Sequence, residues 1–200
     1  MPRLQLIALR SPRAGPFDLS LEPGECLAVT GPSGAGKSLM LRMIADLDPH
    51  DGEALLDGRP RAAMPAPDWR RRVVYGASES GWWLDQVGAH FKTPPVEAAT
   101  ALGLPQDIFA RPVASCSTGE RQRLALLRVL ALDAPVLLLD EPTGALDPEA
   151  VLRAEDLLRQ RLAAGTSILM VTHDPAQANR VGTACAVLEG GRLQVATLTR

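Results

Sequence analysis

Residues 31–38 have the sequence Gly-Pro-Ser-Gly-Ala-Gly-Lys-Ser, which matches the spacing G-x-x-x-x-G-K-[ST] of a phosphate-binding loop. A short apolar run at residues 25–30 precedes this segment, and apolar residues at helical spacing follow it from Lys37 to Leu47. The sequence therefore predicts a strand, a glycine-rich loop and a helix in succession. This is the structural context that the motif requires.

The residues of this loop have distinct expected roles. Its glycines let backbone N–H groups point at phosphate oxygens, and the following helix adds its positive N-terminal end. The Lys37 ammonium is suited to the β- and γ-phosphates of a nucleotide, and the Ser38 hydroxyl is suited to Mg²⁺. Lys37 is also one of only two lysines among 21 basic residues. The residues expected to hold the phosphates are Gly31, Pro32, Ser33, Gly34, Ala35, Gly36, Lys37 and Ser38.

Polar residues follow two further apolar runs. Asp140 and Glu141 end the run at residues 136–139, which is typical of a strand buried on both faces. Because ligands of open α/β sheets bind at the carboxyl ends of the strands, both acids are expected to face the phosphate loop. Asp140 is then a candidate for holding Mg²⁺, and Glu141 for activating the water that attacks the γ-phosphate. The alternative is that they only cap the next turn. His173 also follows an apolar strand, although a lone histidine there more often has a packing role.

The composition is that of one globular domain. The 21 basic and 23 acidic residues give a net charge of -2, which argues against nucleic-acid binding through bulk charge. The longest run without a charged side chain, residues 162–173, is shorter than the roughly 20 apolar residues of a membrane-spanning helix. The N-terminal segment lacks a signal-peptide pattern, and three widely spaced cysteines fit reduced thiols. These features predict a cytoplasmic protein.

Strands alternating with helices predict an α/β domain with a largely parallel sheet. Two half-exposed strands are expected within residues 4–21, and the turn-rich segment 48–68 is expected at the surface around one short strand. Prolines predict short helices with tight joints between residues 84 and 109. Residues 117–120 offer a Ser/Thr cap and an early Glu to start an expected amphipathic helix at 121–132. The remaining expected elements are a strand at 136–140, a helix at 148–163, a strand at 167–171, a short helix at 175–180, and closing strands at 183–189 and 192–198.

Residues 117–123, Ser-Thr-Gly-Glu-Arg-Gln-Arg, lie between the phosphate loop and the acidic strand. They resemble the signature of the nucleotide-binding domain of ABC-type ATPases, usually LSGGQ or LSGGE followed by RQR. Residues 145–147 resemble the D-loop of that family, Thr172-His173 its switch histidine, and residues 189–192 its closing turn. The resemblance extends over essentially the whole chain.

This resemblance implies a P-loop NTPase core with a mixed, largely parallel sheet, an antiparallel β subdomain and a small helical subdomain. The core would comprise residues 1–75 and 117–200, and the helical subdomain about 79–116 of the single 1–200 domain. The implied function is that of the ATP-binding subunit of an ABC transporter, which hydrolyses ATP with Mg²⁺ to drive a separate membrane subunit. Such a subunit works on the inner face of the cell membrane as a homodimer or with a paired ATPase subunit.

The resemblance also implies roles for individual residues. In a head-to-tail dimer, ATP lies between the phosphate loop of one subunit and the signature of the other. The implied catalytic residues are Glu141, His173 and Lys37. The implied nucleotide contacts beyond the phosphate loop are Ser117, Gly119, Glu120 and Asp147. Helix N-terminal amides favour anions, which makes the signature contact physically reasonable.

Departures from the family pattern leave several roles open. The loop after residues 73–75 contains no Gln, where the family has one that contacts Mg²⁺, and the Ser78 hydroxyl or the Glu79 carboxylate is the candidate metal ligand in its place. A plain turn is the alternative. No aromatic residue lies between Arg10 and Ala14 to stack on adenine, so either Arg10 or Arg13 covers the base or the selectivity for the base is loose. At the signature, Cys116 replaces a Leu and Thr118 a Gly.

The adjacent Trp82 and Trp83 cannot both point inward on a regular element, so at least one is expected at the surface, available to the membrane subunit. Packing within the helical subdomain is the alternative. Three further functions also stay open: a mechanical or regulatory ATPase whose membrane partner transports nothing, an ABC-type protein acting on ribosomes or DNA, and a nucleotide-binding module with little hydrolysis. The cargo and the direction of transport depend on the membrane partner.

Overall fold

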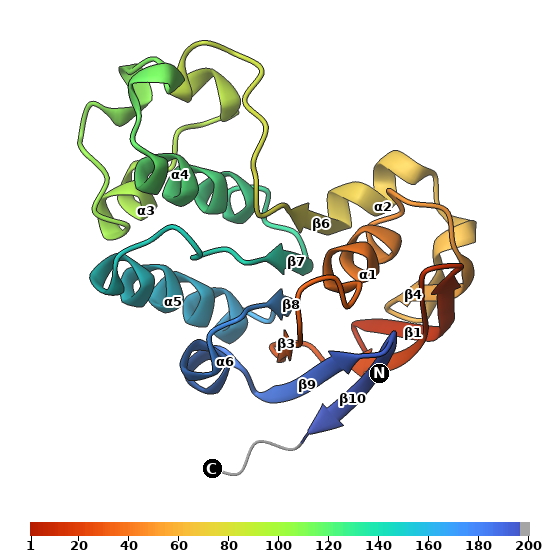
Figure 1. Cartoon of the computed structure of the whole chain (residues 1–200). Helices are drawn as coiled ribbons and strands as arrows, with labels where there is room; N and C mark the ends of the chain where they lie inside the picture. The colour runs from red at the N-terminus through yellow and green to blue at the C-terminus, as the bar shows by residue number, and fades with distance from the viewer. Residues whose placement is uncertain (197–200) are drawn as a thin grey trace.

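A six-stranded sheet contains the parallel strands that the sequence predicts (Figure 1). The computed structural model describes residues 1–196. From one edge to the other, the strands are β10 (Arg192–Ala196), β9 (Ala184–Glu189), β3 (Cys26–Thr30), β8 (Ser167–Val171), β7 (Val136–Asp140) and β6 (Val73–Gly76). Neighbouring strands from β9 to β6 pair in parallel, whereas β10 pairs with β9 antiparallel. The sheet is therefore mixed and mostly parallel.

A four-stranded antiparallel sheet forms a second layer. Its strands, in spatial order, are β2 (Ala14–Leu21), β1 (Leu4–Ser11), β4 (Asp51–Leu56) and β5 (Arg59–Pro60). The alternating burial of β2 shows the half-exposed pattern that the sequence predicts. Together the two sheets confirm the predicted fold class, an α/β fold with an antiparallel subdomain sheet beside a mixed, largely parallel one.

Helices cover both faces of the six-stranded sheet, and one further helix packs against two of these. They are α1 (Lys37–Ile44), α2 (Ala66–Arg72), α3 (Val96–Ala101), α4 (Thr118–Leu130), α5 (Pro148–Ala163) and α6 (Pro175–Val181). Short 3₁₀ helices also occur: η1 (Arg61–Ala63), η2 (Val87–His90), η3 (Ile108–Ala110) and η4 (Val113–Ser115). Among residues 1–196 no helix combines the length and the apolar character needed to cross a membrane.

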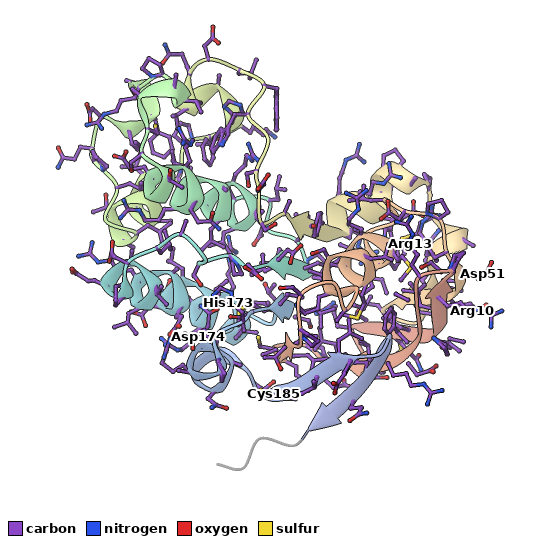
Figure 2. The ribbon with its side chains drawn as sticks, viewed as in Figure 1. Arg10, Arg13, Asp51, His173, Asp174 and Cys185 are labelled. Atoms are coloured by element: carbon purple, nitrogen blue, oxygen red, sulfur yellow. The ribbon has the colours of Figure 1, made fainter. Side chains whose placement is uncertain are left out.

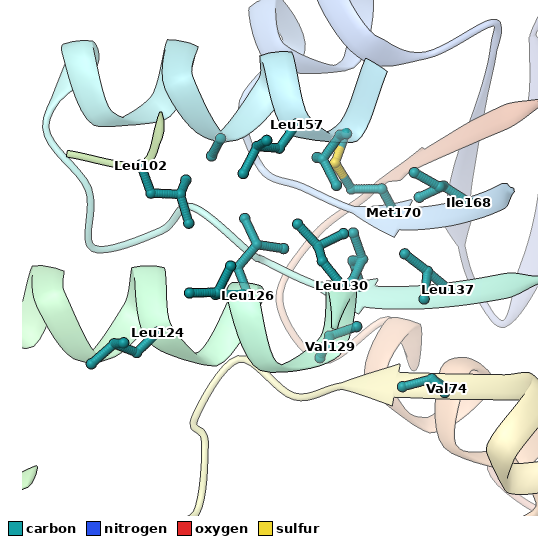
Figure 3. Packing of buried hydrophobic residues seen from close by; sticks show 14 of the residues in the cluster. Val74, Leu102, Leu124, Leu126, Val129, Leu130, Leu137, Leu157, Ile168 and Met170 are labelled. Atoms are coloured by element: carbon teal, nitrogen blue, oxygen red, sulfur yellow. The ribbon is translucent and has the colours of Figure 1, made fainter. Parts of the chain in front are cut away.

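Alternate side chains of β7 pack on opposite faces of the sheet. Leu137 and Leu139 belong to the cluster formed with α4 and α5, which Figure 3 shows from close by. Val136 and Leu138 belong to the cluster formed with α1 and the antiparallel sheet. Because both faces are covered, a continuous apolar run rather than an alternating one builds this strand, as the sequence predicts.

The segment between β6 and α4 consists of short helices joined by turns, as the prolines predict. Its apolar side chains, including Val87, Leu102 and Ile108, are buried in the same cluster as Leu124 of α4. In Figure 1 this segment lies on the side of α4 that faces away from β7. Helix α4 therefore joins the segment to the sheet.

Helix α1 ends earlier than the sequence predicts. The expected helix continues to Leu47, but α1 stops at Ile44 and Asp46 takes a left-handed φ of 59°. The Asp46 carboxylate pairs with Arg61, and Arg70 Nη2 donates to the Asp46 carbonyl at 2.6 Å. These contacts come from residues distant in sequence, so the periodic pattern of the helix could not reveal them.

Residues 48–68 are mostly exposed, as expected, but helix α2 begins within this segment, at Ala66. Trp69 of this helix is fully buried between the two sheets. Its indole Nε1 donates to the Ile44 carbonyl at the end of α1, 2.9 Å away. The indole therefore both fills the core and satisfies a carbonyl at the end of a helix. The expected closing strand 192–198 is present as β10, and its last two residues lie outside the described part of the chain.

Candidate nucleotide site

The loop between β3 and α1 has the backbone that its glycines permit. Gly31 has φ 144°, and a Cβ there would lie 2.2 Å from the Leu188 carbonyl oxygen of β9. Gly36 caps the start of α1 with φ 97°. A side chain at Gly31 would collide with β9, so the loop passes close to its neighbouring strand only because this residue has none.

Lys37 folds back over this loop. Its Nζ donates to the carbonyls of Gly31 at 2.8 Å and Pro32 at 2.9 Å. The ammonium is thus held above the turn whose amides are expected to bind phosphate. Because the lysine ammonium is a compact charge with three N–H donors, it can exchange these carbonyls for phosphate oxygens without a change in the loop backbone.

Three loops meet at one edge of the six-stranded sheet. The phosphate loop follows β3, His173 follows β8, and Glu141 follows β7, and these three parallel strands are neighbours. Asp140 is paired in register with Val171, and the Glu141 N–H donates to the Val171 carbonyl at 3.0 Å. The expectation that both acids share an edge with the phosphate loop is therefore met by the topology.

Glu141 and His173 are in direct contact. His173 Nδ1 lies 3.2 Å from Glu141 Oε2. Glu141 has a left-handed φ of 48°, and its carbonyl accepts from Gln122 Nε2 at 3.2 Å. A non-glycine residue in this region is strained, and such strain often marks a functional position. Glu141 and His173 line a hollow of about 270 Å³ together with Thr172 and Gly144.

Asp140 is 3% exposed. The Tyr75 hydroxyl donates to its Oδ2 at 3.0 Å. Burial, and then the Asp140 carboxylate beside it, raise the pKa of this hydroxyl above its usual range, so it stays a donor at neutral pH. Sequence reasoning did not select Tyr75, because only the pairing of β6 with β7 brings it near Asp140.

The site suits Mg²⁺ rather than a metal held by the protein alone. Within residues 1–196 no group of three or more His, Cys, Asp or Glu side chains is placed to hold a metal ion. Ser38 and Asp140 offer hard oxygen donors, and Mg²⁺ is commonly held by one or two such groups together with substrate phosphates. The donors present therefore fit the expected ion.

The signature begins α4 with a reciprocal cap. Glu120 N–H donates to Ser117 Oγ at 3.2 Å, and Ser117 N–H donates to Glu120 Oε2 at 2.7 Å. The Ser117 backbone bond lowers the pKa of Glu120, which favours the carboxylate. The predicted Ser cap and early Glu are therefore confirmed as a capping box. A Cβ on Gly119 would lie 3.7 Å from the Ala145 carbonyl, so the signature adjoins residues 145–147 of the same chain.

Asp147 starts α5 in a similar way. Its Oδ1 accepts the Ala150 N–H at 2.9 Å, and this bond lowers the pKa of the carboxyl. Within residues 1–196 no hydrogen bond or ion pair connects residues 117–120 or Asp147 to the phosphate loop of the same chain. Their roles in nucleotide binding stay predictions.

Two arginines in the first hairpin remain candidates for covering the base. Figure 2 labels Arg10 beside Asp51, and Arg10 Nε lies 3.8 Å from the Asp51 carboxylate. Ala14, next to Arg13, faces the phosphate loop, because a Cβ on Gly36 would lie 3.2 Å from the Ala14 Cβ. Arg10 is thus paired with Asp51. Arg13 is the residue next to Ala14, which contacts the phosphate loop at Gly36.

Ser78 and Trp82 line a separate groove. Ser78 is exposed and lines a hollow of about 360 Å³ with Trp82 and Arg121. Its role as a metal ligand stays a prediction. Trp83 is 68% exposed, which confirms that at least one of the two indoles lies at the surface. A larger hollow, about 620 Å³, lies beyond the other end of α1 and contains none of the expected site residues.

The parallel core and the phosphate loop after β3 define a P-loop nucleotide-binding domain. Residues 15–144 match the family model described as "ABC transporter". The chain therefore belongs to the ABC transporter family, as an ATP-binding subunit whose ATP hydrolysis is coupled to transport. Members of this family work with a membrane permease. The assignment selects transport among the functions that the sequence left open.

Relatives and a solved structure agree with this assignment. The hemin import ATP-binding protein HmuV of Streptomyces coelicolor is 39% identical over 196 residues, covering 88% of this chain and 69% of the relative. The cytochrome c biogenesis ATP-binding export protein CcmA of Nitrobacter winogradskyi is 35% identical over 168 residues, covering 80% and 83%. A dimeric ATP-binding cassette bound to ADP and Pi has the same fold, with a TM-score of 0.80, 22% identity, and coverage of 96% and 98%.

Proposed function

We propose that residues 31–38, Asp140, Glu141 and His173 form the ATP-hydrolysing site of this transporter subunit. The observation that carries the proposal is the 3.2 Å approach of His173 Nδ1 to Glu141 Oε2. Both residues follow neighbouring parallel strands, and the phosphate loop follows the next strand of that sheet. A candidate base and the residue that orients it thus lie beside a loop with the geometry of a phosphate site.

Binding of ATP begins with the loop. The backbone N–H groups of residues 31–38 and the start of α1 attract the phosphates. Lys37 exchanges its two carbonyl acceptors, Gly31 and Pro32, for β- and γ-phosphate oxygens. When Mg²⁺ is bound, it neutralises charge on these phosphates, and Ser38 and Asp140 are the residues that would hold it.

Hydrolysis uses Glu141 as the base. Its carboxylate accepts a proton from the attacking water, and His173 holds that carboxylate in place through Nδ1 while remaining available to contact the γ-phosphate. Gln122 donates to the Glu141 carbonyl, which supports the left-handed backbone on which the carboxylate depends. The base is therefore oriented by contacts from β8 and α4.

The second half of each site would come from another subunit. We propose a head-to-tail dimer, either of two copies or with a paired ATPase subunit, in which Ser117 and Gly119 contact the γ-phosphate bound by the partner. Glu120 contributes by holding Ser117 through the capping box. Asp147 lies in the segment 145–147, which adjoins the signature. Asp147 and the signature would therefore move together at the dimer interface.

The division of the chain and its location belong to the same proposal. Residues 1–75 and 117–200 would form the core, and residues about 79–116 the helical subdomain. The subunit would work at the inner face of the cell membrane. The names of the relatives include both import and export, so we propose that the permease selects the cargo and the direction.

A Glu141→Gln variant tests this function. Without the base, Mg-ATP binds and closes the dimer but is not hydrolysed, so the variant should migrate as a dimer with Mg-ATP in size-exclusion chromatography and as a monomer without it. Phosphate release should fall by about 10² to 10⁴-fold. A conservative Glu149→Gln change in the exposed first turn of α5 is the control and should behave as the parent. A Glu141→Gln protein that remains monomeric with Mg-ATP and still hydrolyses it would overturn the proposal.

The groove beside Trp82 is the candidate site for the permease. Arg128 lies over both indoles, 4.7 Å from the Trp82 ring and 4.8 Å from the Trp83 ring. His90 Nε2 accepts the N–H groups of Trp83 and Leu84 at 3.3 and 3.2 Å. These contacts hold an exposed apolar loop at the edge of a groove, which supports contact with an apolar helix of the permease.

Replacing Trp83 with Ala tests this contact in membranes that contain the permease. The variant should lose permease-stimulated hydrolysis while keeping basal hydrolysis. Leu132→Ala, at another exposed apolar position, is the matched control. Unchanged membrane association and stimulation in the Trp83→Ala protein would exclude this surface.

A further inference from the structure

We propose that Tyr75 is a positioning residue of this site, whose hydroxyl holds the Asp140 carboxylate in the orientation that binds Mg²⁺. The inference rests on the proposed function of Asp140 and adds a residue that neither the motifs nor the family pattern identified. The bond from Tyr75 Oη to Asp140 Oδ2 is 3.0 Å long.

Strand register brings the two residues together. Tyr75 of β6 pairs with Leu138 of β7 in parallel, and both side chains belong to the cluster on the α1 face of the sheet. Asp140 is two residues beyond Leu138, so its side chain lies on the same face. The tyrosine ring therefore extends diagonally along that face, and its hydroxyl reaches the carboxylate at the carboxyl end of β7.

Burial gives this hydrogen bond its importance. Asp140 is 3% exposed, and within residues 1–196 no ion pair involves its carboxylate. A buried carboxylate without partners is costly, and each oxygen seeks a donor. Tyr75 satisfies Oδ2 and restricts rotation of the group. The other oxygen, Oδ1, would then be the one available to hold Mg²⁺, because rotating the carboxylate would break the bond to Tyr75.

The position of Tyr75 also bears on the missing Gln. The loop after β6 offers Ser78, which is exposed and lines the groove beside Trp82. Tyr75 lies three residues earlier, inside the sheet, and contacts the expected metal ligand through a fixed ring. In this chain, therefore, the contribution of β6 to the metal site would come from Tyr75, a residue of the strand itself, which holds the metal ligand Asp140.

Tyr75→Phe removes the hydroxyl and leaves the ring. Partners that orient metal ligands typically contribute 10-fold to 100-fold in metal affinity. In the Glu141→Gln background, where ATP is not consumed, we expect the Mg²⁺ concentration for half-maximal stabilisation of the ATP-bound protein to rise about tenfold. ATP binding in EDTA should be unchanged. Ser167→Ala removes another buried hydroxyl bond, at the opposite end of β8, and is the matched control.

The chain contains a single tyrosine, so the same question can be answered without changing the residue. With tyrosine labelled by ¹³C at Cζ, Mg²⁺ added to the ATP-bound Glu141→Gln protein should shift the one tyrosine resonance. The shift should saturate at the Mg²⁺ midpoint measured above and should be absent in an added Asp140→Asn variant. Because this measurement keeps Tyr75 in place, it tests the inference even if the Tyr75→Phe protein does not fold.

The outcomes separate this inference from the function on which it rests. A resonance that does not move while Mg²⁺ still saturates ATP-dependent stabilisation would overturn the role of Tyr75 alone. A Tyr75→Phe midpoint within twofold of the parent would do the same. If the parent itself shows no ATP binding, or no Mg²⁺ dependence of that binding, the proposed site is wrong instead.

Discussion

His173 Nδ1 and Glu141 Oε2 lie 3.2 Å apart at the ends of β8 and β7. The Glu141 backbone is tied to β8 as well, since its N–H donates to the Val171 carbonyl. The carboxylate is thus held from its backbone and from its tip by the same neighbouring strand. Held in this way, Glu141 would need little reorganisation to act as the proposed base.

His173→Ala should lower ATP hydrolysis by about 10²-fold, because Glu141 loses the group that orients it. Mg-ATP binding should change far less than turnover, since the phosphate loop is intact. Phosphate release at saturating Mg-ATP measures the effect. His50→Ala is the control, because His50 contacts the Asp48 carbonyl beyond the far end of α1. Equal turnover in the two variants would contradict the role of His173.

Lys37→Arg should weaken ATP binding by about 100-fold. On ATP binding the ammonium would exchange its two carbonyl acceptors, now 2.8 and 2.9 Å away, for phosphate oxygens, and a charged hydrogen bond of this kind contributes about 1.5–3 kcal/mol. A planar guanidinium cannot reproduce this point-charge geometry. Titration calorimetry with Mg-ATP measures the change. Lys92→Arg, on the exposed second lysine, should bind as the parent does.

Trp69→Ala should destabilise the fold by about 3–5 kcal/mol, since it leaves a cavity between the two sheets and frees the Ile44 carbonyl. Trp69→Phe should cost less because it keeps most of the apolar volume. Unfolding in urea measures both. Trp83→Ala, at an exposed indole, should change the unfolding free energy by under about 1 kcal/mol. A small effect at Trp69 would mean that α2 is not part of the core.

The protein should lose stability at alkaline pH through Cys26. Burial raises the pKa of this thiol from 9.0 to about 12. The unfolded chain releases the proton first, so this contribution is complete below pH 9 and is lost as pH rises toward 12. For one group the loss is about 1.4 kcal/mol per pH unit within that window.

Cys26→Ala isolates this contribution. The difference in unfolding free energy between parent and variant should be constant up to pH 8 and should shrink by pH 10. Urea unfolding at pH 7, 8 and 10 measures it. A difference that stays constant to pH 10 would show that Cys26 does not titrate in this way.

Local patterns predicted the parts of the molecule that depend on local contacts. The glycines of the phosphate loop, the apolar run of β7 and the cap formed by Ser117 and Glu120 act over a few residues, and each is present. The parallel sheet then followed from the order of the elements. The edge shared by Asp140, Glu141 and the phosphate loop followed from the rule for ligand sites in such sheets.

The parts that were missed depend on contacts between distant residues. Trp69 is buried because the antiparallel sheet and α1 enclose it, although its own segment is rich in prolines and arginines. The end of α1 is fixed by Arg61 and Arg70 binding Asp46. Tyr75 reaches Asp140 only through the register of β6 with β7. The partners in these polar contacts lie between 15 and 65 positions apart in the sequence, so the pattern of one element does not reveal them.

The hydrogen bonds of Lys37 should lower the reactivity of its amine. An ammonium that donates to two carbonyls is a poor nucleophile, whereas the exposed Lys92 is free to react. Lys37 and Lys92 are the two lysines of the sequence. The ratio of acylation at Lys37 to that at Lys92, read by mass spectrometry, therefore works as an internal gauge of how tightly the loop is closed around its lysine.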